Sequence, residues 1–107
     1  MKTINIPVDF TMTPGTRKIV QGPFSGELFR KELLDDAFLS GEQVKIIFDG
    51  ALGYPPSFLE EAFGQLTRDN KEIPEKDILA RFILVSENDP KIIKDVTKYI
   101  LEARKTK

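Results

Sequence analysis

The stretch VKIIFDG, residues 44–50, is a short apolar run that ends in an acidic residue and a glycine. Its apolar side chains are nearly continuous and mostly β-branched, which is typical of a central strand that helices bury on both faces. Strands of that kind normally run parallel to their neighbours. The stretch therefore predicts an α/β fold around a buried central strand.

Toward the C-terminus the pattern alternates between helix and strand. A helix is predicted from Ser57, because apolar residues recur at helical spacing up to Leu66, and Gly64 is expected to let it pack closely on the sheet. A polar connection follows over residues 69–77, with a helical turn at 75–79. FILV, residues 82–85, is a second buried strand, and Asp89-Pro90 starts the last helix.

Toward the N-terminus the pattern predicts a hairpin and a helix. Residues 4–10 alternate between apolar and polar side chains, as in an edge strand, and Thr13-Pro14-Gly15 is a turn signal before a short strand over 17–20. Ser25 caps a helix that Gly41 ends. The whole order predicts one domain over residues 1–107, with a central mixed sheet of about four strands and helices packed against it. The expected core includes Phe29, Leu33, Phe63, Leu66, Val96 and Ile100.

Composition excludes many familiar kinds of catalytic site. The chain has 107 residues, no Cys and no His, so it has neither a thiolate nucleophile nor an imidazole base, and it lacks the usual zinc ligands. We therefore expect a protein that is not an enzyme and that needs no metal or cofactor. A cysteine-free chain also suits the reducing cytoplasm.

The charge balance argues against nucleic acid and membrane as partners. The formal net charge is -1, and the basic residues Arg17, Lys18, Arg30 and Lys31 lack the aromatic and basic stripe of a nucleic-acid site. No run approaches the roughly 18 apolar residues of a membrane span. A cytoplasmic protein with a protein partner is the expectation.

The segment from Asp49 to Pro56 is the most distinctive loop. It joins the carboxyl end of a buried strand to the start of a helix, the edge at which open α/β sheets place their ligand sites. Glycine and proline shape it, and Tyr54 is either an exposed aromatic anchor or a side chain packed over the core. The predicted partner-binding surface consists of Asp49, Gly50, Gly53, Tyr54, Pro55, Pro56, Ser57, Glu60 and Glu61.

Three sequence segments resemble a known family. They are GPFSG at 22–26, FDGA at 48–51 and SFLEEAFG at 57–64, together with Arg30 in the first helix. They are similar to the STAS-like domains of unassigned function, relatives of the sulfate-transporter and anti-sigma-antagonist domain. The resemblance implies a STAS-like fold and a regulatory module that binds a histidine-kinase-like ATPase or another signalling partner. It also implies that phosphorylation at Ser57, the position that matches the antagonists' serine, switches this binding.

Ser57 has a structural interpretation as well. SFLE at 57–60 reads as a capping box, in which the Ser57 hydroxyl accepts from the Glu60 amide and Glu60 reaches back to the Ser57 amide. A hydroxyl that caps a helix can also carry a phosphate, so both roles stay open.

Two other classes of function compete with the regulatory module. Asp49, Glu60 and Glu61 would serve a small-ligand or metal-dependent enzyme if they clustered near the sheet edge. A homo-oligomeric structural subunit would form if the edge strand over 4–10 paired with a second copy.

Overall fold

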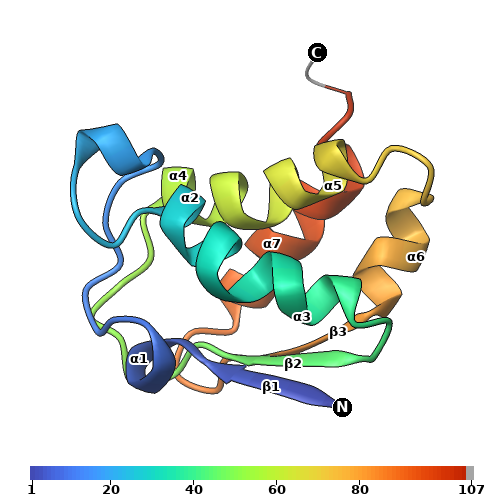
Figure 1. The fold of residues 1–107 in the computed structure, drawn as a ribbon. Coiled ribbons are helices and arrows are strands. Elements are labelled where there is room, and N and C mark those ends of the chain that lie inside the picture. Colours follow the sequence, from blue (N-terminus) through green and yellow to red (C-terminus); the bar gives the residue numbers. More distant parts are fainter. Residues whose placement is uncertain (106–107) are drawn as a thin grey trace.

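The computed structural model describes residues 1–105 of the chain (Figure 1). Three parallel strands form one sheet in the order β1-β2-β3, and they span Lys2–Asn5, Val44–Ile47 and Phe82–Val85. Val44 lies opposite Phe82, which confirms that the two buried strands predicted from sequence are parallel neighbours. The α/β class is therefore confirmed.

Two long helices each contain a wide π-helical turn. The first consists of α2 (Gly26–Phe29), the π turn η2 (Arg30–Leu34) and α3 (Asp35–Leu39). The second consists of α4 (Pro56–Leu59), the π turn η3 (Glu60–Gly64) and α5 (Gln65–Asp69). The other helices are α1 (Ile6–Asp9), the 3-10 turn η1 (Ile19–Gln21), α6 (Glu75–Ala80) and α7 (Lys91–Glu102).

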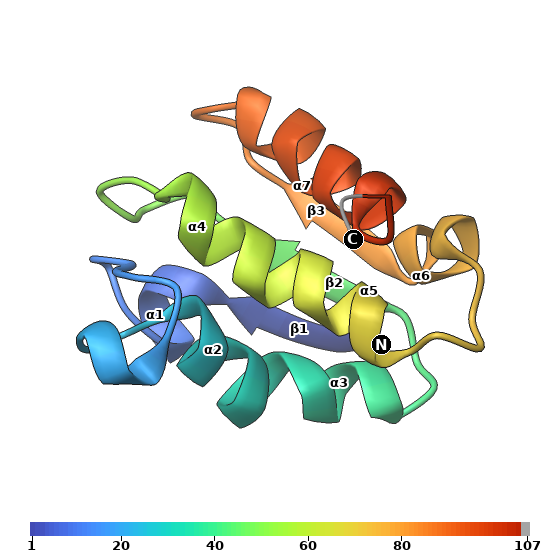
Figure 2. The same ribbon diagram turned by 90° about the horizontal axis from the view of Figure 1, so that it is seen from above.

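The helical layer lies on one side of the sheet. Figures 1 and 2 show both π-containing helices and α7 side by side over the same face of the strands. The expectation that helices bury the central strand on both faces is wrong for residues 1–105, because Lys45 and Ile47 are half-buried and Ile83 on β3 is 37% exposed. No helix in this part of the chain is long and apolar enough to span a bilayer.

The predicted mixed sheet of about four strands is wrong for the described residues, because the N-terminal hairpin is missing. Strand β1 ends at Asn5, and α1 begins directly after it with Pro7 in its first turn. Proline suits the first turn of a helix as well as it suits an edge strand, so Pro7 did not distinguish the two. Residues 17–20 form no strand, since the Thr16 and Arg17 carbonyls accept from the first amides of α2 at 2.8 and 2.9 Å. The backbone hydrogen bonds of this segment go to α2 and to the 3-10 turn η1, and not to the sheet.

The predicted core is confirmed except at one position. Phe29, Phe63, Leu66, Val96 and Ile100 are buried, but Leu33 is only half-buried. Leu34 is fully buried in its place. A π turn contains an extra residue compared with an α turn, so the buried face of the first helix advances by one position.

Candidate functional site

The two π-containing helices touch at Gly26. A Cβ atom at Gly26 would overlap the Phe58 carbonyl oxygen and lie 3.1 Å from the Cβ of Glu61. Only a residue without a side chain allows the helices to approach so closely. Ser25, directly before it, accepts a hydrogen bond from the Leu28 amide at 3.0 Å, which confirms the predicted cap of α2.

A buried ion pair joins these helices at their π turns. Glu61 is 1% exposed and Arg30 is 8% exposed, and the Glu61 Oε2 accepts from Arg30 Nη2 at 3.3 Å. Arg30 Nη1 also donates to Asp35 at 3.1 Å and to Asp69 at 3.2 Å. Burial raises the pKa of Asp35 although Arg30 acts against it. Arg30 thus neutralises the charge of Glu61, which would be costly to bury alone.

Glu60 forms a second, less buried set of ion pairs. Burial opposes its ionisation, but hydrogen bonds from Arg68 and Arg17 prevail and hold the pKa of Glu60 below its ordinary value. The bond from Arg68 Nη1 to Glu60 Oε2 measures 2.7 Å. A Cβ at Gly64 would overlap the Glu60 carboxylate, so Gly64 makes room for this pair. The prediction that Gly64 serves packing against the sheet is therefore wrong.

The segment before α2 is tied to the same acidic residues. Arg17 Nη1 donates to Glu60, and Lys18 Nζ lies 3.3 Å from Glu61 Oε1. Arg17, Lys18 and Arg30 therefore converge on the carboxylates of η3. Because Arg17 and Glu60 are 43 residues apart, no local sequence pattern signals this contact.

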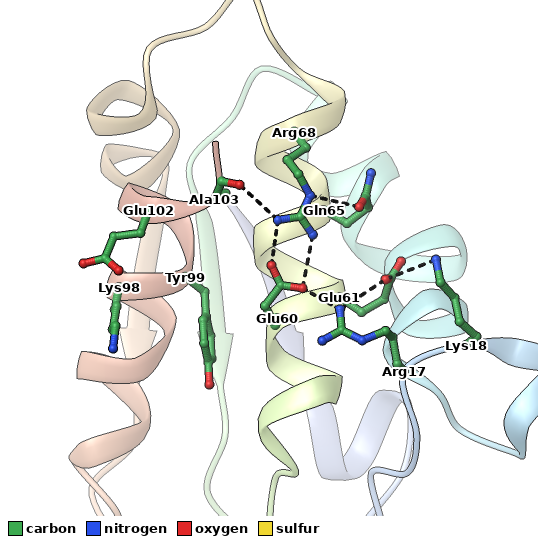
Figure 3. Close-up of a pocket in the computed structure, with 10 residues that line it drawn as sticks. All are labelled: Arg17, Lys18, Glu60, Glu61, Gln65, Arg68, Lys98, Tyr99, Glu102 and Ala103. Atoms are coloured by element: carbon green, nitrogen blue, oxygen red, sulfur yellow. Dashed lines mark hydrogen bonds and ion pairs between the residues drawn. The ribbon is translucent and has the colours of Figure 1, made fainter. Parts of the chain in front are cut away.

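The convergence forms one wall of an open groove between η3-α5 and α7, which we call the charged groove (Figure 3). Its volume is about 540 Å³. The residues that line it are Arg17, Lys18, Glu60, Glu61, Gln65, Arg68, Lys98, Tyr99, Glu102 and Ala103. The sequence pattern indicated that Lys98 belongs to a solvated basic end of the last helix, and it did not single out Tyr99.

The loop after β2 lies at the other candidate site, the carboxyl edge of the sheet. Asp49 accepts hydrogen bonds from the Glu87 and Asn88 amides at 2.9 and 2.8 Å, so its carboxylate holds the loop that follows β3. The Tyr54 hydroxyl donates to the Phe48 carbonyl at 2.8 Å, and burial raises the Tyr54 pKa, with a smaller effect from Asp49. Of the two alternatives for Tyr54, the one packed over the core is confirmed.

The predicted surface is divided between these two places. Asp49, Gly50, Gly53, Tyr54 and Pro56 line a crevice of about 250 Å³ against the start of α7. Glu60 and Glu61 line the charged groove instead. No group of three metal-binding side chains occurs among residues 1–105. The arrangement in which Asp49 clusters with Glu60 and Glu61 is therefore wrong.

Ser57 lies inside the first turn of α4 and does not cap it. The N-cap is Pro55, whose carbonyl accepts from the Phe58 amide at 3.0 Å, and Pro56 takes the first helical position. Glu60 turns to its arginines and not to the Ser57 amide. The predicted capping box is wrong, because proline at the first helical position shifts the start of the helix upstream of the serine.

Apolar side chains are exposed beside the crevice. Leu52 is 81% exposed, Met12 55% and Val8 78%. The Leu52 amide donates to the Met12 carbonyl at 2.8 Å, so the loops that follow β1 and β2 lie against each other. Sequence reasoning missed Val8 and Met12, because Val8 was expected on the apolar face of the edge strand over 4–10 and Met12, between that strand and the turn at 13–15, was given no role.

These features define an α/β domain with a three-stranded parallel sheet, a one-sided helical layer and a charge-paired junction between two helices. The profile of a family described as a STAS-like domain of unknown function (DUF4325) matches residues 25–91. The chain belongs to this family, as its sequence resemblance indicated. It matches no curated protein and no solved structure at a significant level.

The family match begins at Ser25 and includes both π turns. Within the resembling segments, Gly26, Arg30, Glu61 and Gly64 have structural duties: close helix contact, a buried ion pair and space for a second pair. The segments that carry the resemblance therefore have a structural role at the helix junction, which explains their residues without a ligand.

Proposed function

We propose that this domain is a non-enzymatic regulatory module that binds another protein at the carboxyl edge of its sheet. The observation that carries the proposal is the exposure of Met12 and Leu52, on two loops joined by a backbone hydrogen bond, and of Val8 in α1 just before the first of these loops; we call these three residues the edge patch. Single exposed apolar residues are ordinary, whereas a cluster rimmed by polar residues marks interaction surfaces. Leu52 lies in the loop predicted from sequence and lines the same crevice as Asp49, Gly50, Gly53, Tyr54 and Pro56.

The states of the acidic residues favour binding over catalysis. Both Asp49 oxygens accept backbone amides, and Glu60 and Glu61 are paired with basic side chains. A general base needs a carboxylate that is free to take a proton from a substrate. These three carboxylates serve the fold, which argues against the enzyme alternative that would use them.

The partner that the family resemblance implies is a histidine-kinase-like ATPase or another signalling protein. Ser57 is half-buried, and its hydroxyl forms no hydrogen bond among the described residues. In this proposal Ser57 is the phosphoacceptor. A phosphate there adds up to about two negative charges beside the edge patch and weakens binding to a complementary partner face.

The test is affinity capture of the partner from the source cells, followed by affinity measurement with purified variants. Leu52→Ser and Met12→Ser should each weaken binding by about tenfold or more, since truncating a central contact residue costs over 1 kcal/mol. Leu39→Ser is the matched control, because Leu39 is 72% exposed at the end of α3. Equal affinity of all three variants and the wild type would reject the edge patch as the binding surface.

Ser57 is tested separately. Under the proposal Ser57→Asp weakens partner binding and Ser57→Ala does not. If both variants bind like the wild type, Ser57 has no regulatory part, even when the edge patch is the binding surface.

A homo-oligomer is a second candidate that one observation favours. Parallel sheets normally carry helices on both faces, whereas Figure 1 shows the long helices of this domain on one face only. Light scattering at micromolar concentration decides whether a second copy associates. A monomer mass at every concentration would remove this candidate.

A further inference from the structure

The carboxylates of η3 in the charged groove already have cationic partners. Glu60 accepts from Arg17 and from Arg68, and Glu61 accepts from Arg30 and lies 3.3 Å from the Lys18 ammonium. A cation that entered the groove would have to displace one of these side chains. Glu60 and Glu61 are therefore poor ligands for an added cation.

Hydrogen-bond donors, in contrast, remain unused in the groove. The described contacts of the Arg17 side chain involve only Nη1, which leaves Nε and Nη2 available. Lys98 makes no ion pair with any residue between 1 and 105, and over the same range the Tyr99 hydroxyl has no hydrogen bond. These are three donor groups, two of them positively charged.

All three donor groups line the same groove, Arg17 on one side and Lys98 and Tyr99 on α7. Figure 3 shows an unbonded nitrogen of Arg17 on the side toward α7, and the Lys98 and Tyr99 side chains directed along α7 toward its N-terminal end. Long side chains on a helix lean in that direction, so the arrangement follows from the helix geometry. The Arg17 side chain is held by Glu60, and the Arg17 backbone carbonyl accepts from the Glu27 amide at 2.9 Å. The guanidinium is positioned before any ligand arrives.

We propose that the charged groove binds an anionic group, a carboxylate or a phosphate, through the free edge of Arg17, the Lys98 ammonium and the Tyr99 hydroxyl. A planar guanidinium edge matches the spacing of two carboxylate or phosphate oxygens, and charge-assisted hydrogen bonds are the stronger kind. The site is distinct from the edge patch. The proposed anion site does not depend on the proposed protein partner.

The experiment is a nuclear magnetic resonance titration of the full chain with sodium phosphate and, separately, with sodium succinate, at constant ionic strength set by sodium chloride. Saturable shifts confined to amides around residues 17 and 98–99 are expected with at least one of the two anions. Saturation by phosphate alone identifies a phosphate site, and saturation by succinate alone identifies a carboxylate site. Shifts that never saturate, or that spread evenly over surface lysines, overturn the proposal.

Variants that spare the ion pairs sharpen the test. Lys98→Gln should weaken anion binding by up to about fivefold, the upper end of the range for one exposed charge pair. Tyr99→Phe should weaken binding while keeping the ring. Lys94→Gln is the matched control, because Lys94 is exposed on the same helix and lies outside the groove lining. Equal effects of Lys98→Gln and Lys94→Gln would show general charge attraction and overturn the site. Thermal melts that match the wild type establish that each variant is folded.

Discussion

Replacing Glu61 with Gln tests whether the buried ion pair holds the helix junction together. The substitution keeps the size of the side chain and removes its charge. Arg30, which is 8% exposed, would then lose the partner that lies 3.3 Å away in the native protein. Removing one member of a buried pair typically costs about 3–5 kcal/mol, because the other charge stays buried.

The expected loss is smaller than that range for a structural reason. Arg30 keeps Asp35 and Asp69 at 3.1 and 3.2 Å, and the glutamine carbonyl can still accept a hydrogen bond. Contacts from the more exposed Arg17 and Lys18 contribute little, since exposed pairs are worth under about 1 kcal/mol. We therefore expect the free energy of unfolding to fall by about 2–3 kcal/mol, which lowers the midpoint of thermal unfolding by roughly 10–20 °C.

Urea unfolding followed by circular dichroism measures this change. Glu32→Gln is the control, because Glu32 is exposed in the same π turn as Arg30 and forms no ion pair among residues 1–105. Its effect should stay within about 0.5 kcal/mol. A loss below about 1 kcal/mol for Glu61→Gln would refute the reasoning that this charge stabilises the junction.

Three further predictions concern residues around the same helices. Gly26→Ala should lower the free energy of unfolding in urea by about 1–3 kcal/mol, because the added Cβ overlaps a backbone carbonyl. Gly53→Ala is the control, since its Cβ meets nothing within 4 Å and should not change stability. Equal losses of stability in the two variants would contradict the close helix contact. Ser25→Ala should lower the free energy of unfolding by about 1 kcal/mol, because it removes a helix cap. Ser57→Ala should leave the thermal melt nearly unchanged, and a larger loss of stability for Ser57→Ala than for Ser25→Ala would support the capping box at Ser57. The pKa of Glu60 is lowered in the folded state, so its stabilising contribution is present above its ordinary value of 4.5 and is lost as pH falls toward the lowered value. Acid unfolding of Glu60→Gln should consequently show a shallower loss of stability below about pH 5 than the wild type, and identical acid limbs would contradict the pairing.

The buried strands could be predicted because their signal is local. Residues 44–48 and 82–85 are short, apolar runs, and such runs report burial whatever lies beside them. The segment at 17–20 has a similar look but becomes a strand only if a partner strand accepts its backbone hydrogen bonds. In this fold these hydrogen bonds are made with the start of α2 and within the turn η1, an outcome that tertiary structure decides.

The helix junction lay beyond sequence reasoning for a different reason. Helical spacing assumes 3.6 residues per turn, so a π turn exchanges Leu33 for Leu34 on the buried face without any change in composition. Glu60 and Glu61 read as a solvated acidic face until Arg17 and Arg30 are brought from distant positions. The site residues were thus named in part, but their partners and their duties required the fold.

Hydrogen exchange of the domain alone and in complex with its captured partner tests the central claim most directly. The proposed function predicts slower amide exchange on binding in residues 7–13 and 49–58, the two segments that carry or adjoin the edge patch, with no change in α3 or along the three strands. Protection confined to α3 or to the strands, with these loops unchanged, would contradict it.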